Sequence, residues 1–449
     1  SPSGLSHNRF LDYSVDSKGL ILNNSLQDEV SQLGGLLSKN RLYDTQSASK
    51  VLLEVMGTSR SNLSGVTEVF GDSAHVILAN PRGIYINGAG FLNAPQVTLA
   101  TAYPRLSETL DLQSLSVSSG HIQIGELGAP LSLQDKVTLL SQRLSLSGPL
   151  WGGKDLSIFL GQNQYFLDSG LIQVLPSATP SQAVQIALDA ALFSDIQADT
   201  IRLISTDSGV GVNSQSDILT SSGHLDIDVN GQVIVKQVAS AESLHVTANA
   251  LSITESLISV GDTRVSVADD MSLSDTIVGG DLVISTNARL HMTEDAEMNA
   301  QSIDLSLGSL QADTGTAFFS AGEFQVSADG AIVSHANIDV TDTLSLNSEG
   351  TVSFLGDVTA NSLVIEVDEL DIDGNLISLV NASVTANSIH HSGELFSQGA
   401  LTIHAKDSLR NQGQLVANSL SINCLLYTSP SPRDRQKSPM PASACKKNR

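Results

Sequence analysis

Apolar and polar residues alternate along much of the chain, most clearly in its second half. Residues 225–229 are typical, since they read Leu-Asp-Ile-Asp-Val. In an extended strand, such alternation places apolar side chains on one face and polar side chains on the other. Turn-forming pairs such as Asn230-Gly231 and Asp373-Gly374 separate the alternating stretches. The pattern predicts short strands joined by turns, with little helix.

The alternating unit recurs at intervals of about 20 residues from about residue 222 onward. A unit of this length cannot bury its own apolar face, but a stack of such units can. One interval, from Leu363 to Leu401, is close to double, and a degenerate repeat centred near Val384 would fill it. The pattern favours an all-β solenoid, a parallel β-helix with about 20 residues per coil, over a leucine-rich repeat or a propeller. The apolar pairs that mark successive coils are Leu225/Ile227, Leu244/Val246, Val265/Val267, Leu282/Ile284, Ile303/Leu305, Phe324/Val326, Leu344/Leu346, Leu363/Ile365, Leu401/Ile403 and Leu420/Ile422.

One stretch fits two structures. In residues 183–193, Val184, Leu188 and Leu192 have helical spacing, whereas Val184, Ile186 and Leu188 alternate as in a strand. We predict a strand here.

A tight turn stands out within residues 67–93. The apolar strand Val76–Ala79 leads into Asn80-Pro81-Arg82-Gly83, and a second strand opens with Ile84. Asn at the first turn position can bond to the backbone two residues on, Pro fixes φ at the second, and Gly suits the fourth. The sequence predicts a β-turn between two strands.

This turn closely resembles the Asn-Pro-Asn-Gly-Ile motif in the secretion domain of two-partner secretion exoproteins, the filamentous-haemagglutinin-like family. Two departures matter: Arg82 replaces the second Asn, and the second family motif, Asn-Pro-Asn-Leu, survives only as Asn40-Arg41-Leu42. Further blocks resemble the family in the right order, over roughly the first 215 residues. They are Gly4 to Asn8, Gly19 to Ser25, Leu33 to Gly35, Ser59 to Gly65, Val137 to Gly148, Trp151-Gly152 and Ile201 to Val212.

The resemblance implies a domain organisation. Residues 1–215 would form the secretion domain, a right-handed parallel β-helix, and residues 216–423 would continue it as haemagglutinin-type repeats. A dedicated outer-membrane β-barrel transporter would recognise the secretion domain through its periplasmic domains. The residues that match the family's motifs, and are therefore expected to serve transporter recognition, are Asn80, Pro81, Gly83, Ile84, Asn40 and Leu42.

The resemblance also implies a function for the longer protein to which this chain would belong. We expect an adhesin or haemagglutinin of a Gram-negative bacterium, exported through the periplasm and either secreted or displayed on the cell surface. The receptor would be a host or bacterial surface molecule. The alternative within the same family is the delivery stalk of a contact-dependent growth inhibition toxin or of a haemolysin.

The two ends of the chain differ from the rest. Ser1 is preceded by neither an initiator Met nor an apolar signal segment, so we interpret the N-terminus as cut. Residues 424–449 hold both cysteines and four of the twelve prolines, and they resemble the translation of a sequencing-library adapter. We predict that this tail is disordered.

Composition argues against several kinds of partner and chemistry. The first 423 residues hold 17 Lys and Arg against 46 Asp and Glu, which disfavours nucleic acid because phosphates attract a basic surface. No Cys occurs before residue 424, which excludes disulfides and thiol chemistry there. No apolar run reaches the roughly 20 residues that a membrane-spanning helix needs, so no transmembrane segment is predicted.

A carbohydrate-active β-helix enzyme, a polysaccharide lyase or hydrolase, is the alternative from another class. Its acids would come from Asp226, Asp228, Asp269, Asp270, Glu366, Asp368, Asp371 and Asp373. These are the polar positions of alternating strands, so we interpret them as solvated surface. The run from Asp368 to Asn375 lacks the spacing of a calcium loop, and His390, His391 and His404 have no accompanying metal-ligand pattern. We therefore expect no enzymatic activity, no catalytic residue, no metal site and no cofactor.

Overall fold

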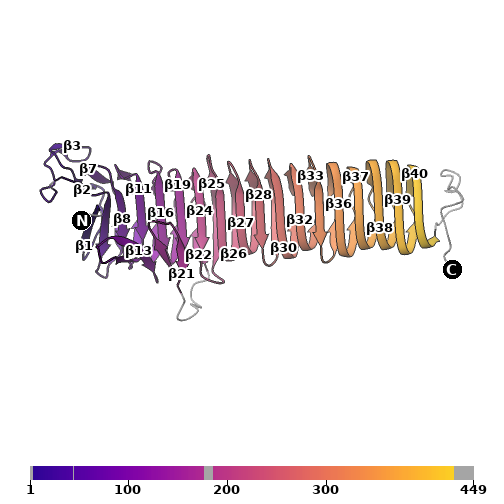
Figure 1. Ribbon diagram of the computed structural model, residues 1–449, viewed down its shortest axis with the longest axis horizontal. Helices are drawn as coiled ribbons and strands as arrows, with labels where there is room; N and C mark the ends of the chain where they lie inside the picture. The colour runs from indigo at the N-terminus through magenta and orange to yellow at the C-terminus, as the bar shows by residue number, and fades with distance from the viewer. Residues whose placement is uncertain (1–3, 44, 176–185, 429–449) are drawn as a thin grey trace. The chain divides into compact units, whose positions relative to one another are not determined.

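The computed structural model describes residues 4–43, 45–175 and 186–428, and every regular element in these ranges is a β-strand. The chain divides into two compact units, Ser1–Asn249 and Ala250–Arg449, here called unit 1 and unit 2. Parallel strands stack on one another within each unit (Figure 1). The predicted fold class, an all-β parallel solenoid, is confirmed. Its predicted right-handed sense stays a prediction.

Unit 1 is built on three parallel ladders, each contributed by successive coils. The first ladder is β1 (Leu5–Phe10), β5 (Lys50–Val55), β8 (His75–Ala79), β11 (Gln96–Ala100), β16 (Lys136–Ser141), β19 (Asp155–Leu160), β24 (Thr200–Ser205) and β26 (Leu225–Ser240). The second is β6 (Ser61–Leu63), β9 (Ile84–Ile86), β14 (His121–Ile124), β17 (Arg143–Leu146), β22 (Ile186–Ala190) and β25 (Gly211–Thr220). The third consists of two separate parts: β2 (Leu20–Asn24), β7 (Thr67–Gly71) and β10 (Phe91–Leu92) form a sheet of their own, and β15 (Ala129–Pro130), β18 (Leu150–Trp151) and β23 (Ile196–Ala198) pair within the large sheet.

Two antiparallel additions interrupt this stack. A four-stranded sheet contains β12 (Tyr103–Leu106), β13 (Leu112–Val117), β20 (Asn163–Phe166) and β21 (Ile172–Val174), and a hairpin contains β3 (Glu29–Ser31) and β4 (Gly35–Leu37). Leu115 and Tyr165 of the four-stranded sheet pack in one apolar cluster with Ile77, Leu140 and Phe159 of the first ladder. The first ladder is therefore covered on both faces, which explains why its strands read as continuous apolar runs.

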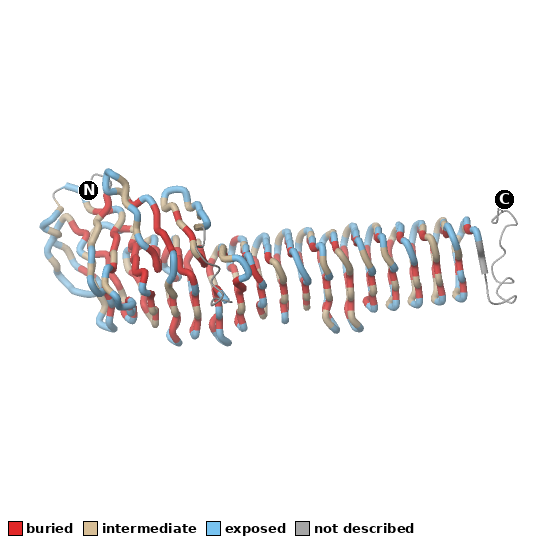
Figure 2. The backbone as a smooth tube through the Cα atoms, turned by 90° about the horizontal axis from the view of Figure 1, so that it is seen from below, coloured by how far each residue is buried: buried red, intermediate tan, exposed pale blue. Residues whose placement is uncertain are grey.

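Unit 2 is more regular. Its strands are β27 (Leu244–Ser259, which begins in unit 1), β28 (Thr263–Val267), β29 (Met271–Val278), β30 (Asp281–Met292), β31 (Glu297–Ala300), β32 (Ser302–Ala312), β33 (Ala317–Ser320), β34 (Phe324–Ala328), β35 (Ile332–Ser334), β36 (Asn337–Phe354), β37 (Val358–Ile372), β38 (Leu376–His391), β39 (Glu394–Asn411) and β40 (Gln414–Thr428). Buried and exposed positions follow one another along them, as the red and pale blue segments in Figure 2 show. Alternation in the sequence has thus become inward and outward placement.

The predicted apolar pairs of unit 2 stack in register. Leu305 pairs with Val326, and Val326 pairs with Leu346 on the next coil. Val384 pairs with both Ile365 and Ile403, so the degenerate repeat predicted around Val384 is a complete coil. All six side chains are buried. The period of about 20 residues is confirmed.

Buried serines mark corners of the coils. The hydroxyls of Ser320, Ser378 and Ser397 each donate to the backbone carbonyl three residues on, at 2.8 to 3.0 Å. In unit 1, Ser240 does the same to Ser243. Each bond satisfies a polar group that the corner would otherwise bury without a partner.

Two local predictions have different outcomes. The strand predicted over residues 183–193 is confirmed for Ile186–Ala190 and wrong for residues 191–193, which lie in a turn region, whereas residues 183–185 lie outside the described residues. Disorder predicted from residue 424 is wrong for residues 424–428, which belong to β40. Cys424 is small and apolar, and it continues the inward positions by pairing with Ala405 while buried. Residues 429–449 lie outside the described part.

Candidate functional site

The turn Asn80–Gly83 connects β8 of the first ladder to β9 of the second. The amide of Gly83 donates to the carbonyl of Asn80 at 3.1 Å, which closes the predicted β-turn. The amide of Asn80 donates to the carbonyl of Ala100 on the next coil, at 2.9 Å. The turn is therefore bonded both to itself and to the coil that follows.

The Asn80 side chain is fully buried, and its amide is saturated with hydrogen bonds. Oδ1 accepts from the amide of Arg82 at 2.9 Å, and Nδ2 donates to the Ser59 carbonyl at 3.1 Å and to Ser61 Oγ at 3.0 Å. Asp could not supply the two donated bonds, and Ala could supply none. Asn80 thus joins its own turn to the preceding coil.

The other turn residues follow from the same packing. Gly83 has φ of +124°, and a Cβ there would lie 3.1 Å from the His121 carbonyl. Ile84 is buried between its ladder partners Ser61 and Ile122. Pro81 is buried as well, whereas Arg82 is exposed. Four of the six predicted site residues are therefore buried and hold the turn in shape. Arg82 is the turn residue whose side chain is exposed to solvent.

The Asn40 motif forms a turn with the same hydrogen bonds. Asn40 Oδ1 accepts from the amide of Leu42 at 2.9 Å, and the Asn40 carbonyl accepts from the amide of Tyr43 at 3.2 Å. Asn40 Nδ2 donates to the Asn23 carbonyl at 2.7 Å. Although this motif lacks Pro, it reproduces the Asn80 geometry at the surface, where the Leu42 side chain is 88% exposed. The hydrogen bonds of the two turns reach different segments of unit 1.

Exposed arginines lie in the Asn80 turn and on nearby coils, and no sequence motif had singled them out. Besides Arg82, these are Arg60, whose guanidinium lies 4.8 Å from the ring centroid of Tyr85, and Arg143. Arg143 pairs with His121, and burial together with the charges of Arg143 and Arg60 lowers the pKa of His121. Within the described residues, none of the three arginines forms an ion pair with a carboxylate. We call Arg60, Arg82 and Arg143 the basic surface.

Five of the carboxylates considered for catalysis lie on strands, as the alternation predicts, whereas Asp269, Asp270 and Asp373 lie between strands. Asp228, Asp269, Asp270, Glu366, Asp368 and Asp373 are exposed, and Asp226 and Asp371 are half-buried. Asp270 is paired with Arg289 at 3.4 Å, and Asp368 accepts a hydrogen bond from Asn387. Asp226 and Asp228 lie on β26, and Glu366, Asp368 and Asp371 lie on β37, so the carboxylates do not gather at one place.

The three histidines considered for a metal site do not converge. His390 points outward, with its Nδ1 3.1 Å from Asp371 Oδ1. His391 points inward, is 1% exposed and shares a 2.8 Å hydrogen bond with Asn411. His404 lies on β39 beside Thr385 and Asn423. Across the part of the chain that the structure describes, no three His, Cys, Asp or Glu side chains are grouped to hold a metal ion.

Comparisons with known proteins place the chain in a family. The profile of the TPS secretion domain, the two-partner secretion domain, matches residues 1–235. The chain belongs to the TPS secretion domain family. The crystal structure of the filamentous hemagglutinin secretion domain matches with a TM-score of 0.51 and 27% identity, over 63% of this chain and 90% of that one. The predicted family and fold are confirmed.

Curated relatives extend the likeness beyond the TPS domain. The "16S rRNA endonuclease CdiA" of Enterobacter cloacae is 32% identical over 92% of this chain, and the "tRNA nuclease CdiA" of Yersinia mollaretii is 28% identical over 87%. The "tRNA nuclease CdiA" of Escherichia coli strain NC101 is 37% identical over 52%. The chain spans only 12%, 13% and 7% of these three proteins, respectively.

Membership of the TPS family carries two consequences. Exoproteins of this family pass through the periplasm to the cell surface or the extracellular space, which confirms the predicted localisation. A TPS secretion domain also implies an outer-membrane transporter as its partner. Over the described residues, no helix is long and apolar enough to cross a membrane.

Proposed function

We propose that the Asn80 turn holds the basic surface in the position that the transporter's periplasmic domains recognise. Asn80, Pro81, Gly83 and Ile84 act indirectly, because buried side chains cannot touch a partner. Arg82, Arg60 and Arg143 make the contact. The exposed Leu42 of the second turn is a further, apolar contact.

Charge supports this assignment. The first 423 residues carry 46 acidic against 17 basic side chains, so an acidic partner is repelled by most of the protein. Three exposed arginines without carboxylate partners give such a partner one attractive place to dock. The transporter surface would then be rich in Asp and Glu, and the charges would fix the docking site and raise the association rate.

The activity of the longer protein is a separate proposal. Relatives that align with nearly all of this chain are named as nucleases, and the chain spans only a small part of each. These names favour the contact-dependent toxin-delivery alternative, with the described coils as the stalk, over an adhesin or haemagglutinin. In either case the described residues serve export and the display of the longer protein. Its toxin or receptor-binding activity would lie outside them.

Secretion with a charge reversal tests the transporter proposal. The chain, preceded by a signal peptide, is co-expressed with its transporter, and periplasm and culture medium are compared. Arg82→Glu together with Arg60→Glu should cut export at least several-fold while melting is unchanged. Arg105→Glu, an exposed arginine on the antiparallel strand β12, is the matched control and should export normally. Normal export of the double reversal would refute a role for the basic surface.

A further inference from the structure

Unit 1 contains a cleft that the secretion function does not use. It has a volume of about 760 Å³ and is lined by residues from β18, β23 and β25 and their loops. Trp151 forms one wall, and it is the only Trp in the chain. Its side chain is 42% exposed at the end of β18. A large indole held at the surface beside an open cleft is available to a ligand.

Planar and apolar side chains form a row at this wall. Pro130 pairs with Trp151, Trp151 pairs with Gln197, and Ile196 to Ala198 of β23 pair with β25, where Leu219 continues the row. Neighbouring members are separated by the strand spacing of about 4.8 Å. The row therefore offers an extended ligand several contacts in line.

The floor next to Trp151 carries no side chain. A Cβ at Gly153 would lie 1.5 Å from the Gln134 carbonyl oxygen, and one at Gly152 would lie 2.8 Å from Leu156 Cβ. Both positions must therefore be Gly for the coil to close. Neighbouring residues therefore fill the space that a side chain at either glycine would need.

Polar groups lie along the opposite edge. Lys154 Nζ is 2.7 Å from Asp135 Oδ1, and Ser221 Oγ donates to Asp199 Oδ1 at 2.6 Å. Within the described residues, the Trp151 indole N–H and the Gln197 amide have no hydrogen-bond partner. A ligand that carries both donors and acceptors could satisfy them.

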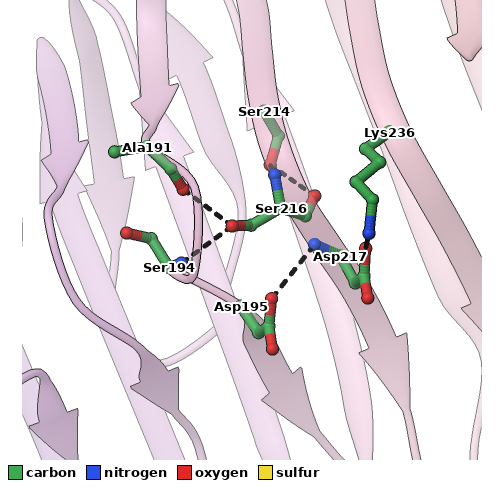
Figure 3. A network of polar contacts seen from close by, with 7 residues as sticks. All are labelled: Ala191, Ser194, Asp195, Ser214, Ser216, Asp217 and Lys236. Atoms are coloured by element: carbon green, nitrogen blue, oxygen red, sulfur yellow. Dashed lines mark hydrogen bonds and ion pairs between the residues drawn. The ribbon is translucent and has the colours of Figure 1, made fainter.

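A polar network fixes the strand that carries Gln197 (Figure 3). Ser216 Oγ donates to the Ala191 carbonyl and accepts from the Ser194 amide, both at 2.7 Å. Asp195 Oδ1 accepts from the Asp217 amide at 3.3 Å, and the Asp195 carbonyl accepts from Leu150 on β18 at 2.9 Å. Both strands are thus tied together immediately before their cleft residues. Such support lowers the entropy cost of binding.

We propose that this cleft binds a neutral carbohydrate chain. A sugar ring can lay its C–H face on the Trp151 indole while its hydroxyls bond to Gln197, Asp199 and Lys154. Asp199 lines the cleft, and the charge of Lys154 is already offset by its ion pair with Asp135 outside the lining, so uronates and sulfated sugars are repelled. A peptide strand is disfavoured because the backbones of β18 and β23 are already paired within their ladder. Export and the basic surface are independent of this proposal.

The single Trp makes the test direct. The full chain is applied to a printed array of neutral and anionic glycans, and the best neutral ligand is then titrated by tryptophan fluorescence and calorimetry. We expect saturable binding and a blue shift of the tryptophan emission. All of this emission comes from Trp151, the single Trp of the chain. Heparin and polygalacturonate should leave the emission unchanged.

Variants then locate the site. Trp151→Ala should abolish the calorimetric signal, and Gln197→Ala should weaken binding about tenfold, the effect of one good hydrogen bond. Tyr103→Ala removes an exposed aromatic residue from β12 and should bind as the unmodified chain does. Circular dichroism confirms that each variant is folded. The proposal is overturned if no neutral glycan binds, if anionic sugars bind better, or if binding survives in Trp151→Ala.

Discussion

Units 1 and 2 both stack parallel strands, but the coils of unit 2 are nearly equivalent to one another and those of unit 1 are not. In unit 2, Leu305, Val326, Leu346 and Ile365 occupy equivalent positions on successive coils, and corner serines recur. In unit 1, single residues have unique partners. Asn80 binds three groups at once, and an antiparallel sheet covers the first ladder. The comparison teaches that regular coils provide length, whereas the turn and the cleft lie where regularity is broken.

Removing one coil from each unit should expose this difference most strongly. Leu346 pairs with Ile365, so deletion of residues 346–364 restores the register in unit 2. Val76 pairs with Val97, so deletion of residues 76–96 restores the register in unit 1. We expect the first deletion to shift the melting temperature by only about 2 °C, since stacking energy is shared between neighbours. The second should abolish cooperative folding of unit 1, because it removes the Asn80 turn and part of the core under β13.

Thermal melting by circular dichroism and limited proteolysis would measure both outcomes. Deletion of residues 346–355, half a coil, is the control for length and should unfold part of unit 2. Equal tolerance of the two one-coil deletions would contradict the distinction between the units.

A single substitution sharpens the comparison. Asn80→Ala leaves the Ser59 carbonyl and the Arg82 amide without their partner, and we expect a loss of about 3 kcal/mol in the free energy of unfolding of unit 1. Asn387→Ala in unit 2 removes only a surface bond to Asp368 and should cost less than about 0.5 kcal/mol. Urea unfolding gives both values. Equal losses would show that the buried hydrogen bonds of Asn80 stabilise unit 1 no more than a surface bond does.

Acid should weaken unit 1 through His75. Burial, with smaller contributions from the charges of Lys50 and Lys136, lowers the pKa of His75 from 6.5 to about 4. The unfolded chain then binds the proton more readily than the folded one. His75 therefore contributes stability fully above about pH 6.5, and this is lost as pH falls toward 4. The loss is at most about 3 kcal/mol.

The pH dependence can be assigned by substitution. His75→Gln cannot titrate and keeps a group able to bond to Thr98 Oγ1, which His75 Nε2 contacts at 2.8 Å. Its stability should fall less between pH 7 and pH 4.5 than that of the unmodified chain. Parallel pH profiles would exclude His75 as the cause. Burial also lowers the pKa of His391 in unit 2. Because His391 is present in both proteins, its effect on stability cancels in the comparison.

Sequence reasoning succeeded where a structure depends on local pattern. Alternation and period were sufficient to place Val384 inward and in register with Ile365 and Ile403. The Asn80 turn followed from the preferences of Asn, Pro and Gly at fixed turn positions. The alternation, the period and the turn preferences each depend on residues that lie within a few positions, or within one coil, in the sequence.

Other features depend on contacts between distant segments, and the sequence did not reveal them. The burial of Asn80 comes from Ser59 and Ser61, and the cleft beside Trp151 needs Gln197 and Asp199 from a later coil. The antiparallel sheet joins β13 to β20 across the 45 intervening residues, 118–162. The boundary at residue 424 failed because composition changed there while inward alternation continued through Cys424.

We expect export to depend on the irregular unit 1 turn and not on how many regular coils follow. Secretion through the cognate transporter tests this most directly. It compares the unmodified chain, the deletion of residues 346–364 and the double substitution Asn80→Ala with Pro81→Ala, all carrying a signal peptide. The deletion variant should reach the medium at the level of the unmodified chain. The double variant, shown to be folded when purified, should accumulate or be degraded in the periplasm. Normal secretion of the folded double variant, or failure of the coil deletion, would contradict it.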